Sequence, residues 1–193
     1  VAGFMTILHG DDRFYNNIFV QKWPADDPHP EDNEEVGTAV FDDYPTYDEW
    51  YKPFKPLEGK PAKEDDMNDL QPAHFSHLPV WAGGNVYFNG AKAWKKETNN
   101  LVNNKDQVKI DLVEKDGKPS IETNLYDFIG DFSDHILTTD DLGEAFEPEQ
   151  RFEMPNGDDI IFNEDYFGNH RGVSTIPGPF KSSEDAKKSL WTR

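Results

Sequence analysis

An asparagine pair inside an apolar segment is the feature that most constrains how this chain folds. Residues 13–20 read RFYNNIFV and follow a corner at Gly10-Asp11-Asp12, whose residue types tolerate unusual backbone angles. A buried amide must have its donors and acceptor satisfied. Stacked coils of a parallel β-helix satisfy them, because equivalent asparagines can hydrogen-bond along the stack. We therefore expect strands at 5–9 and 13–20 that belong to such a stack.

The same pattern returns 72 residues later, in the segment AGGNVYFN at 82–89. Here Tyr87 matches Tyr15 and Asn89 matches Asn17, which indicates two coils of one solenoid. The insertion at 22–73 is rich in proline, which excludes regular strand and helix interiors. It also holds too many aromatic residues for a solvated linker. We expect an ordered loop that wraps on the coils and rims a cleft.

The C-terminal part has the pattern of antiparallel strands. Apolar residues alternate at 108–112 and 121–125 around an Asp116-Gly117 turn. A second hairpin is expected from 152–154 and 160–162, around a turn at 155–158. The only expected helix is a short one at 183–190, with Ser182 or Ser183 as its cap. The fold class is therefore all-β, with the final coils and the inserted loop in residues 1–103 and an antiparallel cap and C-terminal tail in 104–193.

Charge and composition exclude several classes of function. The net charge of −19 would repel nucleic acid and acidic membrane surfaces. Cysteine is absent, which excludes disulfides and thiolate zinc sites. No apolar run approaches the ~20 residues of a membrane span, so we expect a soluble protein, cytoplasmic or secreted. The sequence lacks the nucleophilic-serine, phosphate-loop and dinucleotide-binding motifs.

Three sequence blocks resemble the C-terminal region of glycoside hydrolase family 120. They are GDDRFYNNIFV at 10–20, LPVWAGGNVYFNGAK at 78–92, and DYFG at 165–168 with PGPF at 177–180. The blocks come in the expected order and span nearly the whole chain. The resemblance implies a right-handed parallel β-helix and a retaining β-xylosidase that acts on short xylo-oligosaccharides.

The same resemblance implies that the catalytic residues lie outside this chain. In that family the nucleophilic Asp and the general-acid Glu precede the segment that matches 11–17. The chain opens directly in an apolar segment without an initiator Met, so we expect it to be part of a longer protein. We therefore assign no catalytic residue here, expect both carboxylates upstream of Val1, and expect the isolated chain to be inactive.

The candidate substrate-binding residues come from the first corner and from the aromatic residues. They are His9, Asp11, Asp12, Arg13, Trp50 and Trp81. One corner aspartate would hydrogen-bond sugar hydroxyls while Arg13 keeps it charged. In the competing interpretation, which we favour, the corner aspartate caps backbone amides and pairs with Arg13. An aromatic face can stack on a sugar ring, so further wall candidates are Trp23, Tyr44, Tyr47, Tyr51 and Trp94.

No metal or cofactor is expected. The acidic stretch 26–35 offers oxygen ligands for Ca²⁺ but lacks their regular spacing, and His74 and His77 have no evident third ligand for zinc. The leading hypothesis is the C-terminal segment of a retaining glycosidase acting on β-linked xylose. The alternatives are a non-catalytic module that binds or scaffolds polysaccharide, and a β-helix lyase. The expected partner is an oligosaccharide or polysaccharide, with nucleic acid and membrane excluded and a homo-oligomer left open.

Overall fold

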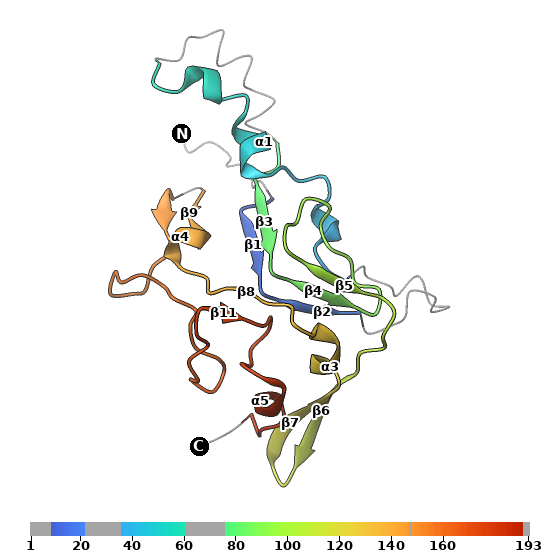
Figure 1. Ribbon diagram of the computed structural model, residues 1–193. Coiled ribbons are helices and arrows are strands. Elements are labelled where there is room, and N and C mark those ends of the chain that lie inside the picture. The colour runs from blue at the N-terminus through green and yellow to red at the C-terminus, as the bar shows by residue number, and fades with distance from the viewer. Residues whose placement is uncertain (1–8, 22–35, 61–75, 147, 191–193) are drawn as a thin grey trace.

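Parallel strand pairing organises the N-terminal part of the fold. The computed structural model describes residues 9–21, 36–60, 76–146 and 148–190. In one ladder β1 (Asp12–Tyr15) pairs in parallel with β3 (Val80–Gly83). In the other, β2 (Ile18–Val20), β4 (Val86–Phe88) and β5 (Leu101–Asn103) pair in parallel in that order. Figure 1 shows the chain turning between β1 and β2, and again between β3 and β4, so that each pass contributes to both ladders.

The predicted register between the two passes is wrong by four positions. Tyr15 lies opposite Gly83 and Phe19 lies opposite Tyr87, whereas the sequence pattern placed Tyr15 with Tyr87. The expected single strand at 13–20 is also broken, because Asn16 has a φ of 55° and turns the chain. Gly84 has a φ of 68° at the matching position of the next pass. The register is therefore set by the corners at Asn16 and Gly84, which align. The match of Tyr15 with Tyr87, on which the prediction relied, does not set it.

The predicted hydrogen bonding between stacked asparagines is present, but Asn17 pairs with Asn85 and not with Asn89. The Oδ1 atom of Asn85 accepts hydrogen bonds from the backbone N (2.8 Å) and Nδ2 (3.1 Å) of Asn17. Asn89, the predicted partner, instead bonds the backbone N and O of Val108 at 2.9 Å and 2.7 Å. The requirement for satisfied amides is met for Asn17, whereas the Oδ1 atom of Asn16 is buried without a hydrogen-bond partner among the described residues. The four-residue register error explains the wrong partner of Asn17.

Polar side chains form a cluster around Glu97, next to the parallel strands. Glu97 accepts hydrogen bonds from Asn85 Nδ2 at 2.7 Å and from Tyr87 Oη at 2.5 Å. Thr38 donates to the same carboxylate at 3.2 Å. Burial raises the pKa of Glu97, while the hydrogen bonds that it receives oppose the rise. The carboxylate therefore serves as the common acceptor that satisfies this part of the core.

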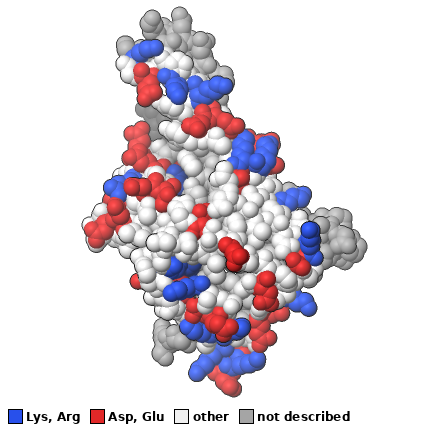
Figure 2. All heavy atoms as spheres, in the orientation of Figure 1, with Lys and Arg blue, Asp and Glu red and all other residues white. Residues whose placement is uncertain are grey.

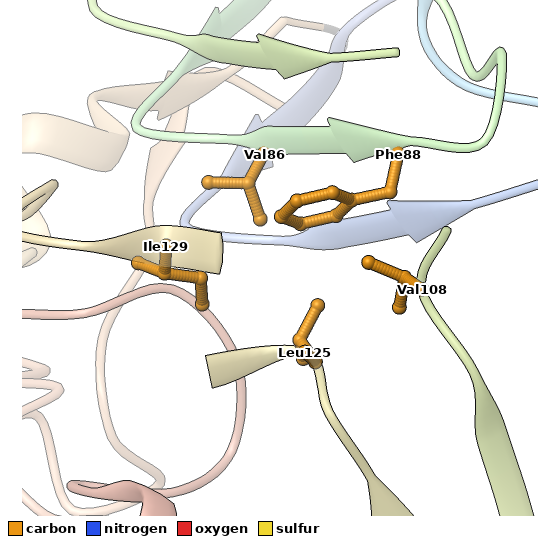
Figure 3. Packing of buried hydrophobic residues seen from close by; sticks show 5 residues of the cluster. All are labelled: Val86, Phe88, Val108, Leu125 and Ile129. Carbon is orange, nitrogen blue, oxygen red and sulfur yellow. The ribbon is translucent and has the colours of Figure 1, made fainter. Parts of the chain in front are cut away.

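Two apolar clusters flank the parallel strands. Val80, Ala82 and Trp94 pack with Phe14 and Phe41 on one side. The second cluster lies between β4 and the region of α3 (Tyr126–Ile129), as Figure 3 shows, and its buried members are Val86, Phe88, Val108, Leu125 and Ile129. The alternation of β1 and β3 leaves Arg13 and Trp81 on the opposite face from the first cluster.

The described part of the insertion contains helical turns, contrary to prediction. These are η2 (Ala39–Phe41), α1 (Tyr47–Tyr51) and η3 (Lys55–Leu57). In α1 the Thr46 hydroxyl accepts from Glu49 N at 3.3 Å, and the Glu49 carboxylate accepts from Thr46 N at 2.9 Å. Pro45 and Pro53 lie outside the ends of α1, so proline bounds the helix and does not interrupt it.

The first C-terminal hairpin is confirmed, with β6 (Ile110–Lys115) and β7 (Lys118–Thr123) antiparallel. Its turn residues Asp116 and Gly117 have positive φ values of 54° and 72°. The hairpin projects from the body in Figure 1, and Leu112 is 73% exposed. The second hairpin is present as an antiparallel bridge between Glu153 and Asp159.

Short elements complete the C-terminal part. They are β8 (Asp134–His135) paired with β11 (Ser174–Thr175), α4 (Thr139–Leu142), β9 (Glu144–Ala145) paired with β10 (Gln150–Arg151), and α5 (Ser183–Ala186). Helix α5 starts after the expected cap Ser182, which accepts from Asp185 N at 3.2 Å, but ends earlier than predicted. The expectation of a single helix was wrong, because α1, α3 and α4 are too short to show helical periodicity. Within the described ranges no helix is both long and apolar enough to cross a membrane.

Few helices and many short strands confirm the mostly-β class. The domain division at 103/104 and the handedness of the coils stay predictions. The expected strand at 5–9, Trp23, the acidic stretch 26–35 and His74 lie wholly or largely outside the described residues.

Candidate functional site

Two adjoining cavities form the candidate site. One has a volume of about 590 Å³ and the other about 410 Å³. Tyr47 and Trp81 line both cavities. The two cavities therefore share a wall, and we refer to them together as the groove.

Aromatic rings from three distant segments form one side of the groove. Tyr47 and Trp50 lie on α1, with ring centroids 6.4 Å apart. The Trp81 ring on β3 lies 6.5 Å from that of Tyr47, and the Phe146 ring meets Trp50 edge-on at 4.6 Å. The capping box that starts α1 fixes the helix from which two of these rings project. These four residues are the aromatic wall.

Arg13 packs against the aromatic wall and joins it to the α4–β9 segment. Its guanidinium lies 4.2 Å from the ring centroid of Trp81, its partner in the strand register, and 4.7 Å from that of Phe152. Its Nε donates to Leu142 O and its Nη2 to Glu144 O, both at 2.6 Å. Only 8% of its side chain is exposed. Arg13 thus joins β1 to the α4–β9 segment with most of its donors occupied.

Asp11 supports Arg13 from behind the groove. Its Oδ1 pairs with Arg13 Nη1 at 2.7 Å, and its Oδ2 accepts from Phe146 N at 2.8 Å. Both carboxylate oxygens are therefore bonded to the protein. This geometry agrees with the interpretation that we favoured from the sequence, in which the corner aspartate caps an amide and pairs with Arg13.

The remaining predicted residues divide into two groups. Arg13, Trp50 and Trp81 line the groove. His9 and Asp12 line neither cavity. The alternation of β1 turns Asp12 away from the face that carries Arg13. Burial and then the Asp11 charge raise the pKa of Asp12.

The other aromatic candidates have structural contacts. Trp94 is only 3% exposed and belongs to an apolar cluster, although it also borders the smaller cavity. Tyr44 stacks on His77, with ring centroids 4.1 Å apart. Tyr51 stacks on Tyr47 at 5.6 Å and lines neither cavity. Among the aromatic residues that the structure describes in the insertion, Tyr47 and Trp50 line the groove.

Carboxylates from α4 and the segment after it face the aromatic wall. Asp140, Asp141, Glu144 and Glu149 line the larger cavity, and Figure 2 shows acidic side chains over this part of the surface. Asp141 also caps its own helix, because its Oδ2 accepts from Thr138 N at 2.7 Å. These residues were not predicted from the sequence. The Thr138–Asp141 spacing is a capping signal, but nothing in the sequence connects it to Arg13, 125 or more positions earlier.

His135 is held between two carboxylates at the junction of the cavities. Its Nδ1 lies 2.8 Å from Asp134 Oδ1 and its Nε2 lies 3.1 Å from Asp141 Oδ1. The hydrogen bond with Asp134, followed by that with Asp141, raises the pKa of His135. Burial acts to raise the pKa of Asp134 and Asp141, but hydrogen bonds outweigh it and lower both pKa values. Those on Asp134 come mainly from His135, and those on Asp141 come from the hydroxyl and backbone N of Thr138 and then from His135. The histidine and Asp141 thereby tie β8 to α4.

Among the described residues, no group of three or more His, Asp or Glu side chains is arranged to hold a metal ion. The groove offers aromatic faces, oxygen acceptors and paired cations. These features suit a polar ligand with flat apolar faces.

Comparison with known proteins supports the fold. The chain is similar to a solved structure of XylC in complex with xylose, with a TM-score of 0.72 and 24% sequence identity. The similarity covers 94% of this chain and 26% of XylC, so the chain spans about a quarter of that protein. At this identity the similarity shows a shared fold. No family model and no curated protein sequence matches the chain.

Proposed function

We propose that the chain forms one wall of a carbohydrate site in a xylosidase-like glycoside hydrolase, and that the aromatic wall is where it contacts sugar. The observation that carries this proposal is the groove itself, which combines exposed ring faces with hydrogen-bond acceptors. Pyranose rings stack on aromatic faces while their hydroxyls donate to carboxylates. The fold that the chain shares with xylose-bound XylC supports the same assignment.

The coil assignment belongs to the same proposal. Both ladders are parallel, and the corners at Asn16 and Gly84 stack in register. These features are those of successive coils in a parallel β-helix, which we take to be right-handed as in glycoside hydrolase family 120. The C-terminal elements would then cover the end of the stack, whose strand edges are otherwise unpaired.

The chemistry follows from the family resemblance and lies outside the described groove. A retaining glycosidase uses two carboxylates about 5 Å apart, one as nucleophile and one as acid and base. The resemblance puts both residues N-terminal to the segment 11–17. In this proposal the present chain binds and orients the sugar, and Arg13 and Asp11 position the wall without touching the reacting atoms.

A binding experiment tests the sugar-contacting role of the aromatic wall. Tyr47 is 46% exposed and borders both cavities. We expect Tyr47→Ala to weaken xylotriose binding about three- to tenfold, as expected for the loss of one stacking face. Titration calorimetry of the full-length protein measures the change. Tyr166→Ala is the matched control, because Tyr166 is 56% exposed and borders neither cavity.

An activity assay separates the glycosidase from a non-catalytic binding module. Full-length protein is incubated with an aryl β-xyloside, and release of the aryl alcohol is followed. Hydrolysis with retained anomeric configuration supports the proposal. Xylotriose binding without hydrolysis would instead favour the binding module, and unchanged binding by Tyr47→Ala would remove the aromatic wall from the site.

A further inference from the structure

The groove has a local charge pattern that bears on which sugars it accepts. Three cationic side chains border the two cavities among the described residues, and each is already paired. Arg13 pairs with Asp11 at 2.7 Å, Lys96 with Glu49 at 2.5 Å, and His135 with Asp134 and Asp141. Lys96 also donates to Tyr44 O at 2.8 Å. The cations are thus held by the protein before any ligand arrives.

Several carboxylates that border the groove, in contrast, have no cationic partner among the described residues. Asp48, Asp140, Glu144 and Glu149 border the cavities and are exposed. None of them makes an ion pair with another described residue. Around the aromatic wall, negative charge is therefore in excess at the positions where a ligand would lie.

This imbalance acts differently on neutral and acidic sugars. A neutral sugar stacks on the rings and donates its hydroxyls to carboxylate oxygens, so the excess charge supplies acceptors. A uronic acid brings a carboxylate that needs an Arg or Lys donor, and the described residues that line the groove have none to spare. At separations near 8 Å, each uncompensated carboxylate weakens binding of an anion by about twofold in water, and three together by about tenfold.

We propose that the groove selects neutral xylo-oligosaccharides and excludes those that carry a uronic acid, with Asp140, Glu144 and Glu149 as the specificity-determining residues. This inference rests on the proposed sugar-binding function and adds the class of sugar. It depends on where these carboxylates lie, and the net charge of the whole chain adds a repulsion that is not specific to the groove.

Paired titrations test the selection. Xylotriose and a xylotriose that carries one glucuronic acid are titrated into the full-length protein at about 20 mM and about 500 mM NaCl. We expect the neutral sugar to bind at least about tenfold more tightly at low salt, and the ratio to shrink at high salt as the Debye length falls toward about 4 Å. The triple variant Asp140→Asn/Glu144→Gln/Glu149→Gln should lower the ratio of the two affinities about tenfold, because it removes the repulsion of the acidic sugar.

A matched control separates local from overall charge. The variant Asp111→Asn/Glu114→Gln/Asp116→Asn removes the same number of charges from the projecting β6–β7 hairpin. It should leave the ratio of affinities unchanged. Equal affinity for the two sugars in the unaltered protein, or equal effects of the two triple variants, would overturn the inference. If neither sugar binds, the proposed function itself fails.

Discussion

Gly84 lies in the corner between β3 and β4, close to Asn16 in the corner between β1 and β2 and to Asp134 on β8. A Cβ atom there would lie 2.2 Å from Asn16 Oδ1 and 2.5 Å from Asp134 Oδ2, and the φ of this residue is 68°. Asp134 in turn bonds His135 at the junction of the cavities. Because Gly84 has no side chain, Asn16 and Asp134 can approach its backbone closely, and Asp134 then contacts His135 in the groove.

Replacement of Gly84 tests this close approach. We expect Gly84→Ala to lower the free energy of unfolding by about 2–4 kcal/mol, since it adds a steric clash to the strain of a positive φ. Urea unfolding measures the loss. Gly172→Ala is the control, because Gly172 has a φ of 84° but no atom within 4 Å of the added Cβ. Equal losses would mean that backbone strain alone accounts for the effect.

The pairing of His135 predicts a pH dependence of stability. Its pKa is raised above the value of about 6.5 expected in the unfolded chain. Its contribution is therefore complete below that pH and is lost as the pH rises through the folded-state pKa. The pKa values of Asp134 and Asp141 are lowered, so their contributions are lost only in acid, as the pH falls through those values.

We expect His135→Gln to remove part of the fall in unfolding free energy above pH 6.5. Urea unfolding at pH 5.5, 7 and 8.5 measures this for both proteins. Glu97, whose pKa is also raised, is present in both, so the difference between them isolates His135. Parallel pH profiles for the two proteins would contradict the prediction.

At the scale of elements, local turn and cap chemistry decided which parts were predictable. The Asp116-Gly117 turn carries its own signal, and β6 and β7 were found from it. Thr46 and Glu49 carry an equally local signal for α1, which the density of prolines around it masked. The Asn17–Asn85 pairing could not be derived, because it depends on which left-handed corners align across an insertion.

The cap of α1 has a measurable consequence for the groove. Thr46→Ala removes the hydroxyl that accepts from Glu49 N, and we expect a loss of about 1 kcal/mol in unfolding free energy. Since α1 carries Tyr47 and Trp50, xylotriose binding should weaken as well. Thr46→Ser keeps the hydroxyl and should restore both measurements. A Thr46→Ser variant as weak as Thr46→Ala would rule out the cap as the cause.

At the scale of the whole molecule, the aromatic wall was partly predictable and the acidic side was not. Tyr47, Trp50 and Trp81 stood out as unusual residue types in an insertion and beside a repeat. Arg13 reaches the other side through backbone carbonyls of Leu142 and Glu144, 129 and 131 positions away. Carbonyl acceptors exist at every residue, so the sequence holds no sign of which ones Arg13 will find.

The location of the two catalytic carboxylates is also a prediction at the scale of the whole molecule. We expect the isolated 193-residue chain to release no product from an aryl β-xyloside, because the proposed family resemblance assigns the two carboxylates to residues that precede the segment matching 11–17. A coupled measurement on the full-length protein replaces both upstream carboxylates by their amides and should abolish turnover. Turnover by the isolated chain, or by that double variant, would place the chemistry within this chain.

The parallel pairings β2–β4 and β4–β5 are joined by chain segments of very different length. Asn17 and Asn85 are 68 positions apart, whereas Val86 and Leu101, which also face one another, are 15 positions apart. Closing the longer segment costs roughly 1 kcal/mol more chain entropy, because this cost grows only with the logarithm of length. The order of assembly is affected more strongly, since contacts between residues close in sequence form first. Among the parallel strands, β4 and β5 would thus pair before β1 and β2 join them, so that the groove gains Arg13 only when β1 docks.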